Sequence, residues 1–149
     1  MPLTIKEEAI TTNLNKTCTE NGLGELRAYY YAVHQPPTGI MIFLGGLLQA
    51  FLIKPFYIGM TDSHLILQPL TSMSNPKGQP IVAEFNEVEY IGQKKVMLGM
   101  KTTFKLYGKK YGLRMNRKVV GWKNSGEQFD RTIKIMKGRL GEKEQDSAF

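Results

Sequence analysis

The stretch Tyr57-Ile58-Gly59-Met60-Thr61-Asp62-Ser63-His64-Leu65-Ile66-Leu67 decides how this sequence is expected to fold. It consists of two mostly apolar runs, and the short polar pair Asp62-Ser63 separates them. Apolar runs of this length are typical of β-strands, and short polar residues between them favour a tight turn. The sequence therefore predicts a β-hairpin, with strands over Phe56–Thr61 and His64–Leu70.

Further strand-like segments lie on both sides of this hairpin. One precedes it, over Leu26–Val33. Residues that favour turns separate the segments that follow, and the tightest of these turns is expected at Gly108-Lys109-Lys110. The chain is therefore expected to be mainly β, with six or seven antiparallel strands. The later strands are expected over Ile81–Phe85, Val88–Gly92, Lys95–Leu106 and Tyr111–Met115.

Helices are expected near both ends of the chain. Thr4 and Glu7 have the spacing of a capping box, which predicts a short helix over Lys6–Lys16. Near the C-terminus, Ser125 is the expected cap of another helix. An open sheet must cover its apolar face, and a helix with one apolar stripe can do so. The stripe consists of Phe129, Ile133, Met136 and Leu140.

The most apolar segment, Gly39–Ile53, is expected to form a further helix just before the hairpin. It has fifteen residues, whereas a helix that crosses a membrane needs about 20. Two alternatives stay open: this helix is buried in the core or between copies of the protein, or it inserts into a membrane surface. The candidate contact residues are its large apolar side chains, Ile40, Phe43, Leu47, Leu48 and Phe51.

The length of 149 residues predicts one domain, because a second would have little room for its own core. We expect residues 1–25 to form an N-terminal extension, residues 26–140 the domain and residues 141–149 a flexible tail. Cys18 is the only cysteine, so no disulfide can form within the chain. The N-terminal residues lack the features of a secretory signal, and a cytoplasmic protein is therefore expected.

Positive charge is concentrated in one part of the sequence. Residues 90–139 contain fourteen Lys and Arg but only two acids, whereas the remaining residues contain six bases and eleven acids. One surface of the folded protein should therefore be positive and attract anionic partners. The candidate binding residues are Lys94, Lys95, Lys101, Lys105, Lys109, Lys110, Arg114, Arg117, Lys118 and Lys123.

Three interpretations of this positive surface are compatible with the sequence. Basic residues on strands and at hairpin tips can contact an anionic membrane, where each contributes about 1 kcal/mol. They can also keep a sheet soluble and prevent its edges from pairing with other chains. Nucleic acid would use the same charges together with aromatic side chains, but no motif of a nucleic-acid-binding module is present. Nucleic acid is therefore the least favoured partner.

Catalytic and metal-binding patterns are missing from the sequence. His34 and His64 are the only histidines, and neither has the spacing to Cys18 that a metal site requires. No nucleophile is paired with a base, and Asp62 is explained as a turn residue that bonds the local backbone. We therefore expect a protein without catalytic activity, cofactor or metal.

The order of these elements resembles that of bacterial pleckstrin-homology-like and GRAM-like domains. Thr61-Asp62 match the turn of these families and Leu65-Ile66-Leu67 match the next strand, while His64 stands where Arg is common. The resemblance covers residues 26–140. It implies a bent barrel of about seven antiparallel strands, capped by a C-terminal helix, with the additional apolar helix before the second strand.

The resemblance also implies a binding or targeting module. Relatives that bind phosphoinositides use basic residues between their first two strands, but the corresponding segment here, His34–Thr38, has no Lys or Arg. A specific phosphoinositide site is therefore not expected. The expected function is peripheral contact with an anionic membrane surface or a protein partner through the basic face. The alternative is a homo-oligomeric interaction domain that has no role in lipid binding.

Overall fold

The structure, a computed structural model, describes residues 4–34 and 54–141. Within these residues seven antiparallel strands form one sheet, in the order β4-β3-β2-β1-β7-β6-β5. The expected mainly β fold is thereby confirmed. The strands are β1 (Ala28–His34), β2 (Lys54–Met60), β3 (His64–Pro69), β4 (Ile81–Glu84), β5 (Val88–Val96), β6 (Gly99–Leu106) and β7 (Lys109–Asn116). The helical elements are α1 (Glu7–Asn21), the 3-10 turn η1 (Phe85–Glu87), α3 (Ser125–Met136) and the π-helical turn η2 (Lys137–Gly141).

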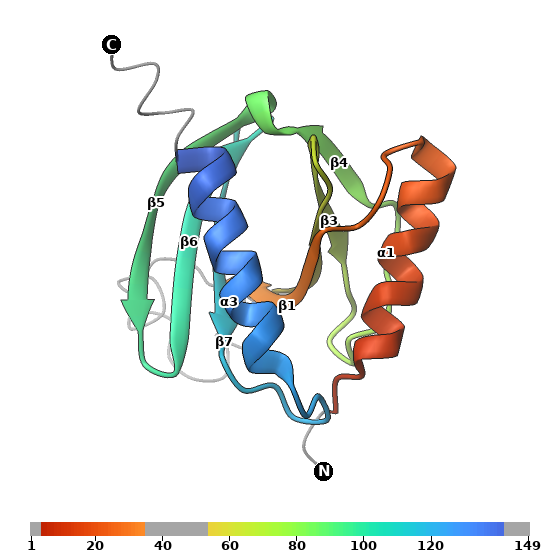
Figure 1. Cartoon of the computed structure of the whole chain (residues 1–149), viewed down its shortest axis with the longest axis vertical. Coiled ribbons are helices and arrows are strands. Elements are labelled where there is room, and N and C mark those ends of the chain that lie inside the picture. Colours follow the sequence, from red (N-terminus) through yellow and green to blue (C-terminus); the bar gives the residue numbers. More distant parts are fainter. Residues whose placement is uncertain (1–3, 35–53, 142–149) are drawn as a thin grey trace.

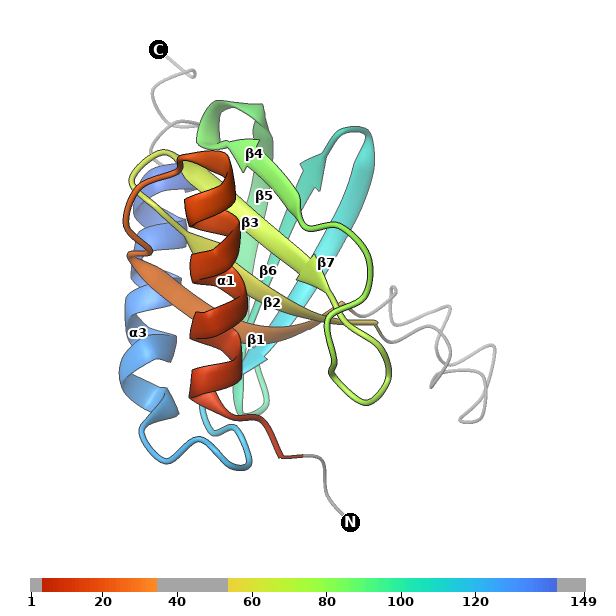
Figure 2. The same cartoon turned by 90° about the vertical axis from the view of Figure 1, so that its right-hand side faces the viewer.

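The sheet is curled into a half-barrel. Strands β1–β4 and strands β5–β7 cross at an angle (Figure 2). Within the described residues, a short pairing of Val33 with Arg114 and His34 with Leu113 joins β1 to β7. Helix α3 lies in front of the sheet in Figure 1, and α1 stands at the right-hand side of the molecule. This arrangement is consistent with a pleckstrin-homology-like fold.

The two helices bury opposite faces of the first strands. Leu14 of α1 lies against Gly59 of β2, where an added Cβ would be 3.0 Å from the Cδ1 atom of Leu14. Phe129 of α3 instead packs against Tyr30, with 5.8 Å between the ring centroids. Gly59 is opposite Tyr29, and the adjacent residues Tyr29 and Tyr30 project from opposite faces of β1. Because both faces of β2 are covered, its last five residues are all buried.

The hairpin expected around Asp62-Ser63 is confirmed as β2 and β3, which pair from Phe56 with Pro69 to Met60 with Leu65. The prediction of one strand over Lys95–Leu106 is wrong, because the chain turns at Met97-Leu98, between β5 and β6. Leu98 adopts the left-handed conformation, with a φ of 71°. Leucine rarely does so, and the sequence therefore gives no sign of this turn.

Three boundaries differ from the sequence-based expectation. The turn expected at Gly108-Lys109-Lys110 lies at Tyr107-Gly108, where both φ angles are positive, as a type I′ turn requires. Helix α1 is capped at Lys6 rather than Thr4, without a side-chain hydrogen bond. Ser125 is the first residue of α3 and not its cap, because its hydroxyl donates to the carbonyl oxygen of Arg117 instead, at 2.7 Å.

The apolar stripe expected on the C-terminal helix is confirmed, since Phe129, Met136 and Leu140 are buried and Ile133 is partly buried. Within residues 4–34 and 54–141, neither helix combines the length and the apolar character that crossing a bilayer demands. The helix expected over Gly39–Ile53 lies outside the described residues, as does the tail from residue 142. The same holds for the candidate contact residues Ile40, Phe43, Leu47, Leu48 and Phe51.

Candidate functional site

Three of the predicted basic residues form a row across β5, β6 and β7. Lys94 is directly opposite Lys101, and Lys101 is directly opposite Arg114. Residues opposite each other in an antiparallel pair project from the same face, with Cβ atoms about 5 Å apart. We call Lys94, Lys101 and Arg114 the basic row. Like charges opposite each other weaken a sheet, so the basic row costs stability unless an anion lies near it.

No carboxylate neutralises the basic row within the part of the chain that the structure describes. The ion pairs found there involve Arg27 and Arg117 instead. Arg114 donates to two neutral acceptors, the carbonyl oxygen of Met97 at 2.8 Å and Oδ1 of Asn116 at 3.2 Å. These bonds fix the position of the guanidinium and leave its charge uncompensated.

Lys105 and Lys110 extend the same face toward the turn between β6 and β7. They are directly opposite each other, and the buried Phe104 points to the other face of β6. One acid is close to them, since Glu89 of β5 is opposite Lys105. The face is therefore most strongly positive at the basic row.

Two further candidates lie on the opposite face of the sheet. The Nζ atom of Lys109 is 5.2 Å from the centroid of the Tyr111 ring, and Tyr111 is buried. Lys95 is opposite Met100, which alternates with the outward-facing Lys101. The structure therefore separates Lys95 and Lys109 from the basic row.

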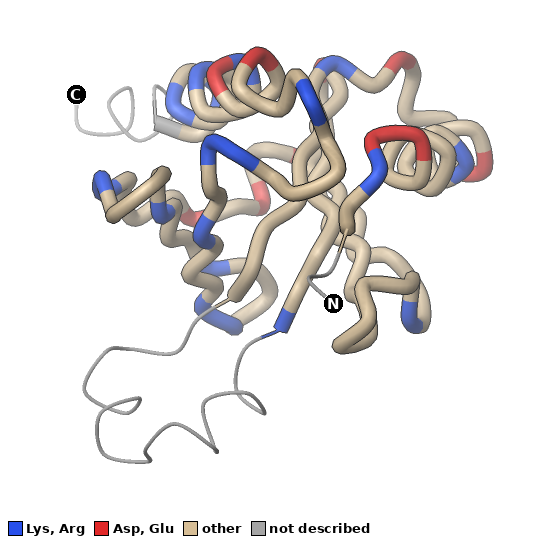
Figure 3. The backbone as a smooth tube through the Cα atoms, turned by 90° about the horizontal axis from the view of Figure 1, so that it is seen from below, with Lys and Arg blue, Asp and Glu red and all other residues tan. Residues whose placement is uncertain are grey.

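The last three candidates belong to the loop between β7 and α3. Arg117 holds Asp130 of α3 through two hydrogen bonds, one of them 3.0 Å from Nη2 to Oδ2. Its guanidinium also lies over the Phe129 ring, which makes it a link between loop and helix. Lys118 and Lys123 are exposed. Figure 3 shows Lys and Arg spread along the strands and this loop, whereas α1 carries acids on the other side of the molecule.

A cleft of about 750 Å³ opens between the loop after β3 and the first residues of β2 and β7. Lys54, Lys77 and Lys109 line it, together with apolar side chains such as Phe56 and Tyr111, and no acid is among its described lining residues. It could hold an anion that carries an apolar part. Lys54 and Lys77 were not predicted as site residues, because they lie outside the basic part of the sequence and only the fold brings them to Lys109.

His34 lies beside this cleft and is influenced by its charges. Its Nδ1 atom accepts a hydrogen bond from the backbone N–H of Gly112, at 3.1 Å. Burial lowers the pKa of His34 below 6.5, and the nearby Lys109, Lys54 and Lys101 lower this pKa further. The imidazole is therefore neutral at pH 7 and adds no charge to the positive surface.

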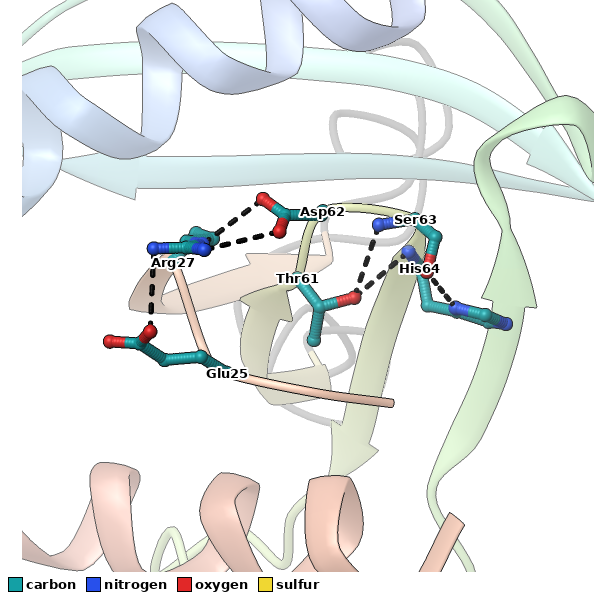
Figure 4. Close-up of polar contacts among 6 residues, drawn as sticks. All are labelled: Glu25, Arg27, Thr61, Asp62, Ser63 and His64. Atoms are coloured by element: carbon teal, nitrogen blue, oxygen red, sulfur yellow. Dashed lines mark hydrogen bonds and ion pairs between the residues drawn. The ribbon is translucent and has the colours of Figure 1, made fainter. Parts of the chain in front are cut away.

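The turn between β2 and β3 has a structural role (Figure 4). Asp62 accepts two hydrogen bonds from the Arg27 guanidinium, at 3.0 and 3.1 Å, and these bonds lower the pKa of Asp62. The Thr61 hydroxyl accepts the backbone N–H groups of Ser63 and His64. The prediction that Asp62 bonds the local backbone is therefore wrong, because Thr61 does so and Asp62 instead ties the start of β1 to the turn.

The remaining reactive side chains form no cluster in the described part of the chain. Within residues 4–34 and 54–141, no three His, Cys, Asp or Glu side chains are close enough together to hold a metal ion. Cys18 is buried, and desolvation raises the pKa of its thiol. A thiol in this state is a poor nucleophile, because the thiolate is the reactive form.

Comparisons with known proteins include a distant structural similarity. No protein-family model and no characterised sequence matches this chain. The structure is similar to that of the hSac2 domain from human phosphoinositide phosphatase Sac2, with a TM-score of 0.44 and 10% sequence identity. The similarity covers 97% of this chain and 86% of that chain. At this TM-score and identity it supports no statement about family or function.

Proposed function

We propose that this chain is a noncatalytic, pleckstrin-homology-like binding module that contacts an anionic membrane surface through the basic row. One observation carries the proposal: Lys94, Lys101 and Arg114 are directly opposite one another, and no described carboxylate pairs with any of them. This arrangement weakens the sheet by itself and becomes favourable when phosphate groups compensate the charge.

The shape of the basic row favours a surface over a single small ligand. Neighbouring strands are about 4.8 Å apart, so three strands spread the charges over about 10 Å of an open sheet face. Several lipid headgroups can meet such a row at once. Each cation near an anionic leaflet contributes about 1 kcal/mol, so the three residues supply only about 3 kcal/mol. Binding should therefore be reversible and sensitive to salt.

The test compares two variants with the same net charge in vesicle sedimentation. Lys94→Gln/Lys101→Gln removes two charges from the basic row, and Lys6→Gln/Lys16→Gln removes two exposed charges near or on α1. Arg114 is left unchanged because it holds the carbonyl of Met97. We expect the first variant to bind vesicles containing phosphatidylserine about 30-fold more weakly than the unmodified protein. The α1 variant should bind nearly as well as the unmodified protein.

Two outcomes would contradict the proposal. In the first, vesicles with phosphatidylserine retain no more of the unmodified protein than vesicles of phosphatidylcholine alone. In the second, both variants lose binding equally, which would mean that net charge acts without any contribution from the row.

A protein-interaction or self-assembly domain is the second candidate, and the position of β5 as an edge strand of the described sheet favours it. An edge strand presents unpaired backbone groups that another chain can pair with. This candidate predicts a stable oligomer and no preference for anionic vesicles. Size-exclusion chromatography with light scattering distinguishes the two, because a strictly monomeric protein would exclude self-assembly.

A further inference from the structure

The tip of the β5–β6 hairpin presents two large apolar side chains to solvent. Met97 is 79% exposed and Leu98 is 71% exposed. They form the turn itself, and the tip lies at the same end of the molecule as the loop between β7 and α3 (Figures 1 and 2). Isolated exposed apolar residues are common, but two adjacent ones at a projecting tip can enter an apolar phase together.

The tip is fixed by bonds to β7 and the residue that follows it. The guanidinium of Arg114 donates to the carbonyl oxygen of Met97, and the backbone N–H of Arg117 donates to the carbonyl oxygen of Leu98, both at 2.8 Å. Gly99 approaches β7 so closely that an added Cβ would be 2.0 Å from the carbonyl oxygen of Met115. Since both tip carbonyls are paired within the protein, they need no water when the tip leaves solvent.

Cations surround this apolar tip. Lys94 and Lys95 precede it on β5, separated from it by Val96, Arg114 bonds to it, and Lys118 lines a hollow that Leu98 also lines. We call Lys94, Lys95, Arg114 and Lys118 the basic collar.

The hollow beside the tip has about 540 Å³ and is lined by apolar atoms of Leu98, Met100 and Phe129, together with Lys95, Lys118 and Arg117. No acid is among these lining residues, and Arg117 is already paired with Asp130. An apolar centre inside a ring of cations matches the boundary region of an anionic bilayer, where acyl chains lie directly beneath phosphates.

We infer that the Met97-Leu98 tip inserts into the interfacial region of an anionic phospholipid bilayer while the basic collar contacts the phosphates. This inference rests on the proposed function and deepens it, because it names the inserted element and thereby fixes how the domain is oriented. Charge complementarity favours an anionic bilayer over a protein as the binding partner. An apolar groove on a protein would accept the two side chains but would provide no anions for the basic collar.

The first test replaces the tip without disturbing its backbone. Met97→Ser/Leu98→Asn removes both apolar side chains, and Asn is among the residues that tolerate the left-handed conformation found at Leu98. The control is Ile91→Thr, which removes a 46% exposed apolar side chain from the same strand, about 20 Å from the tip. We expect the tip variant to bind phosphatidylserine-containing vesicles at least about tenfold more weakly, and the control to bind unchanged.

The second test reports where the tip lies. Met97→Cys is labelled with a polarity-sensitive fluorophore, and the buried Cys18 does not compete for the label. Emission should shift to the blue and rise when vesicles containing phosphatidylserine are added, and stay unchanged with phosphatidylcholine alone. A label at Ile91→Cys should remain in an aqueous environment with both.

The outcomes separate the inference from the proposed function. If the unmodified protein does not bind anionic vesicles, the proposed function fails. If it binds, but the tip variant binds as tightly and the label at position 97 stays aqueous, the basic row is sufficient and the insertion of the tip is refuted. An emission shift that follows protein concentration without vesicles would show a second copy as the occupant and also overturn the inference.

Discussion

His34 lies close to lysines of the positive surface, and these lysines affect its protonation. Burial, Lys109, Lys54 and Lys101 lower its pKa below 6.5, so the folded protein resists protonation more than the unfolded chain does. The stability linked to His34 is therefore complete above about pH 6.5 and is lost as the pH falls from there toward the folded-state pKa.

We expect His34→Asn to remove this loss of stability. The Oδ1 atom of the introduced Asn can accept a hydrogen bond from the N–H of Gly112, as Nδ1 of His34 does. Unlike His, the Asn side chain does not titrate. Urea unfolding at several pH values measures the free energy of unfolding of both proteins. The unmodified protein should lose stability relative to the variant as the solution becomes acidic. Parallel curves for the two proteins would contradict the expectation.

At the scale of elements, the β5–β6 hairpin depends on one close approach. The Gly99→Ala substitution places a Cβ within 2.0 Å of the Met115 carbonyl oxygen, and this backbone atom cannot move without disturbing β7. The matched control is Gly92→Ala in the same hairpin, where nothing lies within 4 Å of an added Cβ. We expect Gly99→Ala to cost more than about 2 kcal/mol of stability and Gly92→Ala about 0.5 kcal/mol or less. Equal chemical-denaturation midpoints for the two variants would disprove this role of Gly99.

The two hairpins show which elements could be predicted from the sequence. In β2–β3, two apolar runs flank short polar residues that form a turn, so the local sequence and the fold agree. In β5–β6, the turn consists of Met97 and Leu98, neither of which favours a turn. Gly92 lies within β5, next to a bulge at Ile91, rather than at the end of a strand. Helix α3 was predicted from its apolar stripe, but not its first turn, because Ser125 bonds to the β7–α3 loop.

The candidate site was predictable only in part, for a similar reason. Composition identifies the basic residues, but the alignment of Lys94, Lys101 and Arg114 follows from strand register. That register depends on the unrecognised turn and on the bulge at Ile91. The exposed tip could not be predicted, since the sequence indicated one continuous strand there. Lys54 and Lys77 come near Lys109 only through the curling of the sheet.

The whole molecule is electrically polarised. Strands β5–β7 carry the basic row, whereas α1 carries Glu7, Glu8 and Glu20 on the other side (Figure 3). An anionic surface attracts the first side and repels the second, so long-range forces orient the domain before any contact forms. The apolar tip lies on the same side of the molecule as the basic row. The charges that orient the domain toward an anionic membrane therefore also bring the tip to the membrane surface.

These two contributions should respond differently to salt. Raising the ionic strength from about 0.1 M to about 1 M shortens the screening length from about 10 Å to about 3 Å and weakens the contribution of the basic row. Burial of Met97 and Leu98 depends on removing apolar surface from water and is not screened. The ratio of vesicle affinities between the unmodified protein and Lys94→Gln/Lys101→Gln should therefore approach one as salt rises. The ratio between the unmodified protein and Met97→Ser/Leu98→Asn should stay nearly constant. Sedimentation across this salt range measures both ratios, and two ratios that fall together would mean that the tip acts only through charge.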